Sequence, residues 1–283
     1  MDRRIVKFGI FGMLVAVGGA TALARAEHGF HHGFWKAKVD EHIDGALDAA
    51  KVTPAQREAI HADRDRVFAT FEENGNERGA RVAKAIALFE SDRIDPAAIA
   101  ELRSEHQAEA KRSGDAIVSA IIDAHGVLTG PQRTAVVEYA RAHRPPMMGG
   151  GKMEHGQWMK RIATNRIEAA LNAAKVTEAQ RATIDAARDR VFAALETEHQ
   201  NPGAHLEEAL DLFAADEVDQ SKIAAIRAQH EERARRIGDV VVQAILEAHD
   251  ALDSSQRHAI GDFVRAHQEE HQRAQERSHE QKD

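Results

Sequence analysis

One helix-start phrase occurs four times in this 283-residue chain, and its copies divide the chain into two similar halves. The phrase VTPAQR, which starts at Val52, returns as VTEAQR 124 positions later, and twelve of the seventeen residues in 52–68 are identical in 176–192. Two related phrases, LTGPQ and LDSSQ, begin at Leu128 and Leu252. A direct repeat of this length predicts two similar folding units joined in tandem.

Each copy of the phrase predicts the start of a helix. A Thr or Asp side chain at the N-cap accepts a hydrogen bond from a free backbone N–H, and a Gln three residues later bonds back to the cap residue. Pro54 follows the first cap, where its missing N–H costs nothing. The predicted helix-capping residues are Thr53, Gln56, Thr129, Gln132, Thr177, Gln180, Asp253 and Gln256.

The fold class predicted by this pattern is all-α, with four to five helices in each repeat. Aromatic residues make up only 5% of the chain, and almost all of its 6 prolines fall at capping or linker positions. In the first repeat we expect helices over about 35–50 and 53–71, a shorter one carrying Val82, Ile86 and Phe89, a long one over 95–125, and a last one over 130–143.

The long helix of each repeat carries a narrow apolar stripe with alternating spacings of three and four residues. Gly114 and Gly238 lie beside this stripe, which predicts the close approach of a second backbone. Each repeat has few large apolar side chains. We therefore expect the two repeats to bury part of their faces against each other, as an intramolecular pseudo-dimer.

The first 26 residues predict export. Arg3, Arg4 and Lys7 precede an apolar run and two small-residue cleavage sites, which is the pattern of a signal peptide. An uncleaved signal anchor is the rival interpretation, since the run is nearly long enough to cross a bilayer. No later segment predicts a membrane span. The expected location is the periplasm.

Charge and composition exclude several classes of function. Removal of residues 1–26 takes away four basic residues and one acidic residue, so the net charge falls from −8 to −11. An acidic chain is a poor nucleic-acid binder, because phosphate contacts need clustered Lys and Arg. The chain has no cysteine, which excludes disulfides, thiolate metal sites and a Cys nucleophile. No Gly-rich phosphate loop, H-E-x-x-H motif or isolated carboxylate pair is present, so we expect no enzyme activity.

The chain is expected to divide into five parts. They are a signal peptide (1–26), a first repeat (27–144), a linker rich in Pro, Met and Gly (145–154), a second repeat (155–268) and a charged tail (269–283). The tail has almost no apolar residues, which leaves a helical extension and a disordered segment both open.

An exported, cysteine-free helical chain in which two L/V-T-x-x-Q helix starts bracket a long amphipathic helix resembles the periplasmic Spy/CpxP family. The resemblance covers both repeats, about 35–145 and 158–268. It implies a fold of two tandem Spy/CpxP-like repeats that form one cradle. It also implies a function, that of a chaperone that binds unfolded or misfolded envelope proteins without ATP during envelope stress. No cofactor is required by such a function, association into homo-oligomers is left open, and the sequence singles out no client-binding residue.

The sequence departs from the family pattern in two ways. Asp253 stands where the last motif has Thr, and Asp caps a helix equally well. The acidic charge is the larger departure, because founding members of the family are basic and attract clients partly by charge. The resemblance therefore leaves the client preference open.

The alternative function is metal handling, as in the related periplasmic heavy-metal resistance and sensor proteins. The sensors' paired ligands are absent, since Ile43, Leu47, Ala120 and Ala124 stand where the resemblance would place them. A looser cluster at the start of each repeat offers imidazole and thioether groups that suit zinc, copper or nickel. Its members are His28, His31, His32, Met147, Met148, Met153 and His155.

Four further histidines lie on the long helices. His106 and His230 fall on the apolar stripe, where the expected role is a core-edge side chain with a hydrogen-bond partner, and a metal pair or a pH switch is the lesser alternative. His125 and His249 fall in the last turn, where a cation interacts favourably with the helix dipole.

Overall fold

The computed structural model describes residues 32–143, 152–198 and 202–280, and the all-α fold class is confirmed for these residues. The expected signal peptide and most of the linker lie outside them. The helices are α3 (His32–Ala49), α4 (Pro54–Glu90), α5 (Pro96–Val127), α6 (Gly130–Ala142), α7 (Lys152–Ala173), α8 (Glu178–Glu198), α9 (Pro202–Ala214), α10 (Gln220–Ala251) and α11 (Ser254–Glu280). Over the described ranges, no helix is both long and apolar enough to cross a bilayer.

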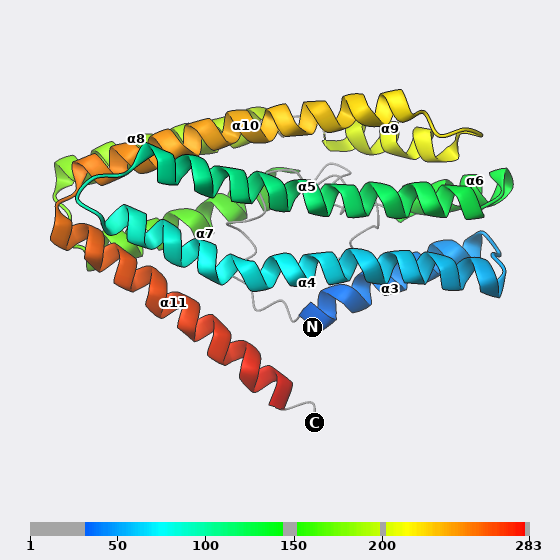
Figure 1. The fold of residues 1–283 in the computed structure, drawn as a ribbon, viewed down its shortest axis with the longest axis horizontal. Coiled ribbons are helices and arrows are strands. Elements are labelled where there is room, and N and C mark those ends of the chain that lie inside the picture. Colours follow the sequence, from blue (N-terminus) through cyan, green and yellow to red (C-terminus); the bar gives the residue numbers. More distant parts are fainter. Residues whose placement is uncertain (1–31, 144–151, 199–201, 281–283) are drawn as a thin grey trace.

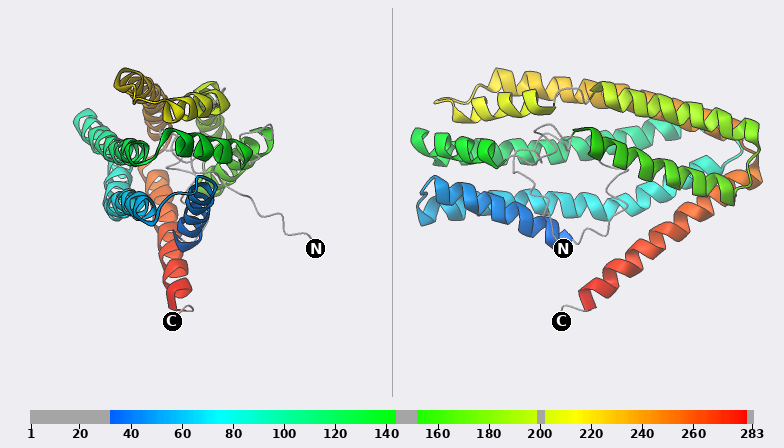
Figure 2. Two further views of the ribbon diagram at one scale, coloured as in Figure 1. Left: turned by 90° about the vertical axis from the view of Figure 1, so that its right-hand side faces the viewer. Right: turned by 180° about the vertical axis from the view of Figure 1, so that it is seen from behind.

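The helices form an elongated body built on two long antiparallel pairs (Figures 1 and 2). The first pair is α4 with α5, and the second is α8 with α10. The short helices α3 and α6 pack together in the first half, as α7 and α11 do in the second. Helix α11 leaves the body obliquely, so that its C-terminal end stands away from the other helices.

The first half differs from expectation in having one helix where two were predicted. Helix α4 runs without a break from Pro54 to Glu90, through Gly75 and Gly79. In the second half the equivalent residues form α8 and α9, and α9 begins at Pro202. Proline is favoured at a helix start and cannot continue a preceding helix. The first half has Arg78 at the position of Pro202, and the helix continues.

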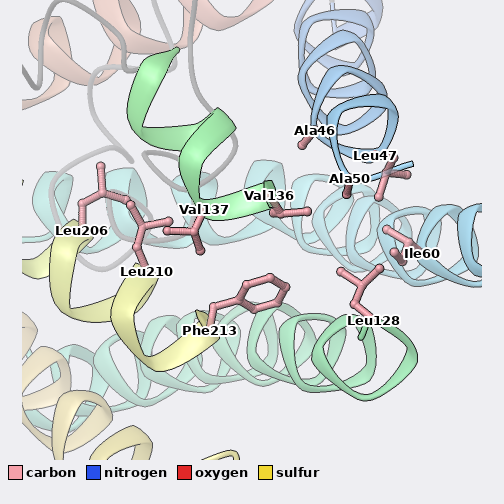
Figure 3. Packing of buried hydrophobic residues seen from close by; sticks show 10 residues of the cluster. All are labelled: Ala46, Leu47, Ala50, Ile60, Leu128, Val136, Val137, Leu206, Leu210 and Phe213. Carbon is pink, nitrogen blue, oxygen red and sulfur yellow. The ribbon is translucent and has the colours of Figure 1, made fainter. Parts of the chain in front are cut away.

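The larger apolar core lies where both halves of the chain meet (Figure 3). Leu47 of α3, Ile60 of α4 and Val137 of α6 pack with Leu210 and Phe213 of α9. Leu210 and Val137 are the most completely buried large side chains of the described residues. A second core cluster contains Leu171, Ile184 and Leu252, with Phe89 of the first half packed against it. Each half therefore contributes an aromatic side chain to the core of the other.

The prediction of a close helix approach at the two glycines was wrong. A Cβ atom added at Gly114 would meet no atom within 4 Å, and one added at Gly238 would meet only the Arg103 side chain, at 3.9 Å. Helices α5 and α10 instead pack along α4 and α8, their partners in the long pairs.

Candidate functional site

The four motif glutamines each close a helix start. In the first, Thr53 Oγ1 accepts from the backbone N–H of Gln56 at 3.3 Å, and Gln56 Oε1 accepts from the N–H of Thr53 at 2.9 Å. The last copy has the same geometry, with Asp253 Oδ1 accepting from the Gln256 N–H at 2.8 Å. The Asp253 carboxylate thus caps this helix in place of a Thr hydroxyl. The side chains of Gln132 and Gln180 accept from the cap residues of the other two starts, at 3.0 and 2.8 Å.

The same glutamines also bond to one another, which the motif alone does not predict. Gln56 donates to Gln132 Oε1 at 2.9 Å and accepts from Gln132 Nε2 at 3.1 Å. Gln180 and Gln256 make the matching pair, at 2.8 and 3.0 Å. Each half therefore holds its two motif helices together by a reciprocal amide pair. The sequence signal is the presence of two such motifs in every repeat.

An arginine follows every motif glutamine, and these residues were missed by sequence reasoning. Arg133 and Arg257 are buried, and each donates from Nη1 to the carbonyl oxygen of the Leu that begins its phrase, at 2.9 and 2.7 Å. Arg57 pairs instead with Asp44, at 2.6 Å. The repetition of Arg in all four copies was the available signal.

The two halves are joined by contacts that recur in reciprocal form at the 124-residue offset. His125 Nε2 donates to the Ala215 carbonyl oxygen at 2.8 Å, and His249 Nε2 donates to that of Ser91 at 2.9 Å. Both imidazoles are buried, and each lies edge-on to the other half's core aromatic, Phe213 or Phe89. Both histidines lie in the last turn of a long helix, as the sequence predicted, but the sequence did not predict that both rings belong to the contact between the halves.

Ion pairs join the middles of the two long helices in the same reciprocal way. Arg103 of α5 pairs with Asp239 of α10 at 2.5 Å, and Arg227 of α10 pairs with Asp115 of α5. The two arginines are 124 positions apart, and so are the two aspartates, so each pair joins equivalent positions of opposite halves. Reciprocal contacts of this kind are what a twofold axis produces in a symmetric dimer.

An apolar cavity of about 150 Å³ lies between α3, α4 and α5. Its wall includes Phe68, Phe71 and Ile121, and several wall residues are only half-buried, so the cavity opens to solvent. The remaining wall residues are Val39, Ile43, Ala46, Leu47, Ile60, Asp63, Arg64, Val67, Ile117, Ala120, Ala124, Leu128, Val136 and Phe213. Ile43, Leu47, Ala120 and Ala124, named above in connection with a metal site, all belong to this wall.

Asp63 and Arg64 are the two charged residues in that wall. Asp63 is 6% exposed and pairs with Arg66, which also lies 3.3 Å from Asp123. Burial raises the pKa of the Asp63 carboxyl, against the opposing effect of Arg66. Arg64 pairs with Asp40 at 3.1 Å. The second half has Ala187 at the position of Asp63, so the buried carboxylate is a feature of the first half.

The histidines of the long helices do not share one environment. His106 is 62% exposed and lies 3.7 Å from Glu109, so its expected place at a core edge was wrong. His230 is half-buried, and its ring centre is 6.1 Å from that of His205. Burial lowers the pKa of His230, and the nearby Arg233 and His205 lower it further. Arg233 donates to His205 Nε2 at 3.2 Å, so a guanidinium group already occupies the position beside the His205 ring.

The candidate metal ligands fall largely outside the described residues. His28, His31, Met147 and Met148 precede α3 or α7, in segments that the structure does not describe. His32, Met153 and His155 lie on the first turns of α3 and α7, and their side chains are likewise not described. Within the described part of the chain, no three His, Asp or Glu side chains converge to hold a metal ion.

Comparison of the chain with models of known protein families, with curated proteins and with solved structures finds no match.

Proposed function

We propose that the protein is an exported, ATP-independent chaperone of the Spy/CpxP type, in which the two halves of one chain act as a pseudo-dimer. The observation that carries this proposal is the set of reciprocal contacts between the halves. The hydrogen bonds of His125 and His249 and the ion pairs of Arg103 and Arg227 recur at one offset, as an isologous interface requires. A fused pseudo-dimer supplies both sides of a shared surface.

The proposed mechanism is weak, reversible binding of the client to the chaperone surface. A chaperone without nucleotide can release its client only if each contact is individually weak, so its surface must offer apolar groups dispersed among charges. Half-buried side chains such as Val67, Phe71 and Phe192 provide the apolar groups here. Ion pairs such as those of Arg66 and Arg190 lie among them. Such a surface holds an unfolding chain without enclosing it.

The acidic charge of the chain indicates which clients are favoured. A net charge of −8, or −11 after removal of residues 1–26, attracts cationic chains and repels anionic ones. We propose that basic envelope proteins are the preferred clients. The attraction weakens with salt, because the Debye length is only about 8 Å at physiological ionic strength.

The test is an aggregation assay with the mature protein and an unfolding client of known charge. We expect suppression of light scattering by a basic client, in the presence of a chelator and without ATP. Parallel samples with Zn²⁺, Cu²⁺ or Ni²⁺ separate this function from metal handling. Suppression that appears only with one of these ions would contradict the proposal and favour the metal-binding alternative.

A further inference from the structure

We propose that the cavity of the first half is a side-chain pocket for the client, which takes an aromatic or branched aliphatic side chain that is flanked by Lys or Arg. This inference rests on the proposed function and adds the class of segment that is recognised. It concerns the wall formed by α3, α4 and α5, with Phe68 and Phe71 on one side and Ala120 and Ala124 on the other.

The composition of the wall decides what can enter. A water molecule needs two to four polar partners, and fifteen of the seventeen wall residues are apolar. A cavity of about 150 Å³ with walls of Leu, Ile and Phe is large enough for one benzene ring, as an engineered cavity of that size shows. The occupant is therefore an apolar group about the size of one Phe, Leu or Ile side chain.

The small residues on α5 create the space. Ala120 and Ala124 lie one helical turn apart and face the rings from α4, so two short side chains stand where larger ones would fill the wall. Protein interiors are normally packed without such voids, and an unfilled one costs stability. A side chain from another polypeptide recovers the lost contacts.

The charge at the edge of the cavity selects what flanks that side chain. Asp63 and Asp123 share one guanidinium, that of Arg66, whose side chain is 65% exposed. Arg64 is shared in the same way by Asp40 and Asp65. Lys36 lies over the Phe68 ring, 5.2 Å from its centre. In these two ion-pair groups four carboxylates thus share two guanidinium groups, and one of the carboxylates, Asp63, is buried in the wall.

A cation beside the pocket would be stabilised by this arrangement. Asp63 is taken out of water by burial, and its ion-pair partner is divided between two acids. A Lys or Arg that flanks the inserted side chain adds the missing positive charge, whereas a Glu or Asp adds to the negative charge. An apolar ligand without a flanking charge gains binding free energy only from its contacts with the apolar wall.

The experiment measures binding of three short blocked peptides to the full mature protein by isothermal titration calorimetry. One peptide has Phe between lysines, one has Phe between glutamates, and one has Ala between lysines. We expect the first to bind at least about tenfold more tightly than the other two. Equal affinity for the Phe and Ala peptides would overturn the proposal.

Substitutions on the wall locate the binding. Ala120→Leu fills the cavity and is expected to weaken binding of the Phe–Lys peptide by about tenfold or more. Ala244→Leu alters the equivalent position of the second half and should leave the affinity unchanged. If Ala120→Leu does not fold, Ala124→Leu and its counterpart Ala248→Leu make the same comparison. An equal loss in the two halves, or no loss in either, contradicts the pocket.

Asp63→Asn tests the charge without changing the volume. We expect this variant still to bind the Phe–Lys peptide more tightly than the Ala–Lys peptide, but to lose several-fold of the preference for Lys over Glu. An unchanged preference would show that Asp63 does not select the flanking residue, and the proposal would fail on that point.

The peptide titration is independent of the aggregation assay. A protein that suppresses aggregation equally well with and without Ala120→Leu, and binds no peptide, would keep its proposed function and lose the pocket. If the peptides fail to bind but toluene binds the wild type and not Ala120→Leu, the cavity is a small-molecule site and the inference is wrong.

Discussion

At the scale of single residues, the motif glutamines have two tasks that depend on the same amide group. Gln56 Oε1 accepts both from the Thr53 N–H and from Gln132 Nε2, so the cap and the pairing share one atom. The Nε2 of Gln56 is shared in turn between Gln132 and the carbonyl oxygen of Val127, at 2.7 Å. A shorter or a charged side chain cannot satisfy all of these partners.

We expect the two glutamines of one half to be energetically coupled. Gln56→Ala or Gln132→Ala should each cost about 1–2 kcal/mol, since a cap and a partly buried hydrogen bond are lost together. A double-mutant cycle on this pair should give a coupling of about 0.5–3 kcal/mol in urea unfolding. The matched control is Gln56→Ala with Gln256→Ala, which share no partner and should be additive. Additivity in the first cycle would contradict the amide pair.

The buried imidazole of His42 should make the stability of the protein depend on pH. The side chain is buried, its Nδ1 lies 3.2 Å from the Lys38 carbonyl oxygen, and Nε2 is buried without a hydrogen-bond partner. Burial is the largest cause that lowers its pKa; His143 and the Lys38 side chain lower it further, while the Lys38 carbonyl and Glu41 oppose the shift. In the affected pH range, the unfolded chain binds a proton more readily than the folded one. The contribution is therefore full above about pH 6.5 and is lost as the pH falls below it.

The measurement is the free energy of unfolding at pH 7.5 and pH 5.5, for the wild type and for His42→Leu. We expect a smaller difference between the two pH values in the variant. The control is His106→Leu, which replaces an exposed side chain and should keep the wild-type difference. Burial raises the pKa of Asp63, which acts in the opposite direction but nearer to its ordinary value of 3.8. An unchanged slope in His42→Leu would contradict the assignment.

At the scale of the helices, the continuity of α4 depends on what stands at position 78. The stretch between Phe71 and Val82 contains two glycines, each of which costs about 1 kcal/mol in a helix interior. Contacts with α5 support the helix here. Asn74 is buried and donates to Ser113 Oγ at 2.8 Å, and Arg112 donates to Asn74 at 3.0 Å.

Proline at this position should break α4, because a proline inside a helix removes a backbone hydrogen bond; in the second half, α9 begins at the equivalent Pro202. Arg78→Pro is expected to cost about 3 kcal/mol, through a lost backbone hydrogen bond and a ring clash. Arg78→Ala, the control for the loss of the side chain, should cost much less. Far-UV circular dichroism measures the helix content of each variant, and thermal unfolding measures its stability. Equal stability of the two variants would mean that α4 tolerates a break at this point.

Local patterns predicted the helices better than they predicted the contacts between them. Capping boxes and spacing are read within a few residues, and the starts at Pro54, Gly130 and Glu178 follow from them. The Gln56–Gln132 pair joins residues 76 positions apart, and the His125–Ala215 bond joins residues 90 positions apart. Neither produces a periodic signal. The cavity depends on which small and large residues face one another, which becomes visible only once the helices are packed.

At the scale of the whole molecule, ion pairs join the halves at the middle, and apolar packing together with the His125 and His249 hydrogen bonds joins them at the ends. α6 packs on α9 at one end and α11 packs on α4 at the other. Between these ends, the ion pairs Arg103–Asp239 and Arg227–Asp115 join α5 to α10. These side chains are 34–45% exposed, so each pair contributes modestly and is screened by salt.

A charge exchange tests whether these pairs hold the middle of the molecule. Arg103→Asp should lower stability by about 1 kcal/mol or less, through like-charge repulsion with Asp239. Adding Asp239→Arg should restore most of the loss in urea unfolding at low salt. At high salt both effects should shrink. If the double variant is no more stable than Arg103→Asp alone, the two side chains are not in contact.

The recurrence of one set of contacts at a fixed offset has an evolutionary consequence. In an assembly of two identical subunits, any mutation appears on both sides of the axis, and a change useful on one side must be tolerated on the other. A single chain that carries both halves is free of that constraint. The halves differ at Asp63 and Ala187 and at Arg78 and Pro202, so a substitution in one half leaves the other half unchanged.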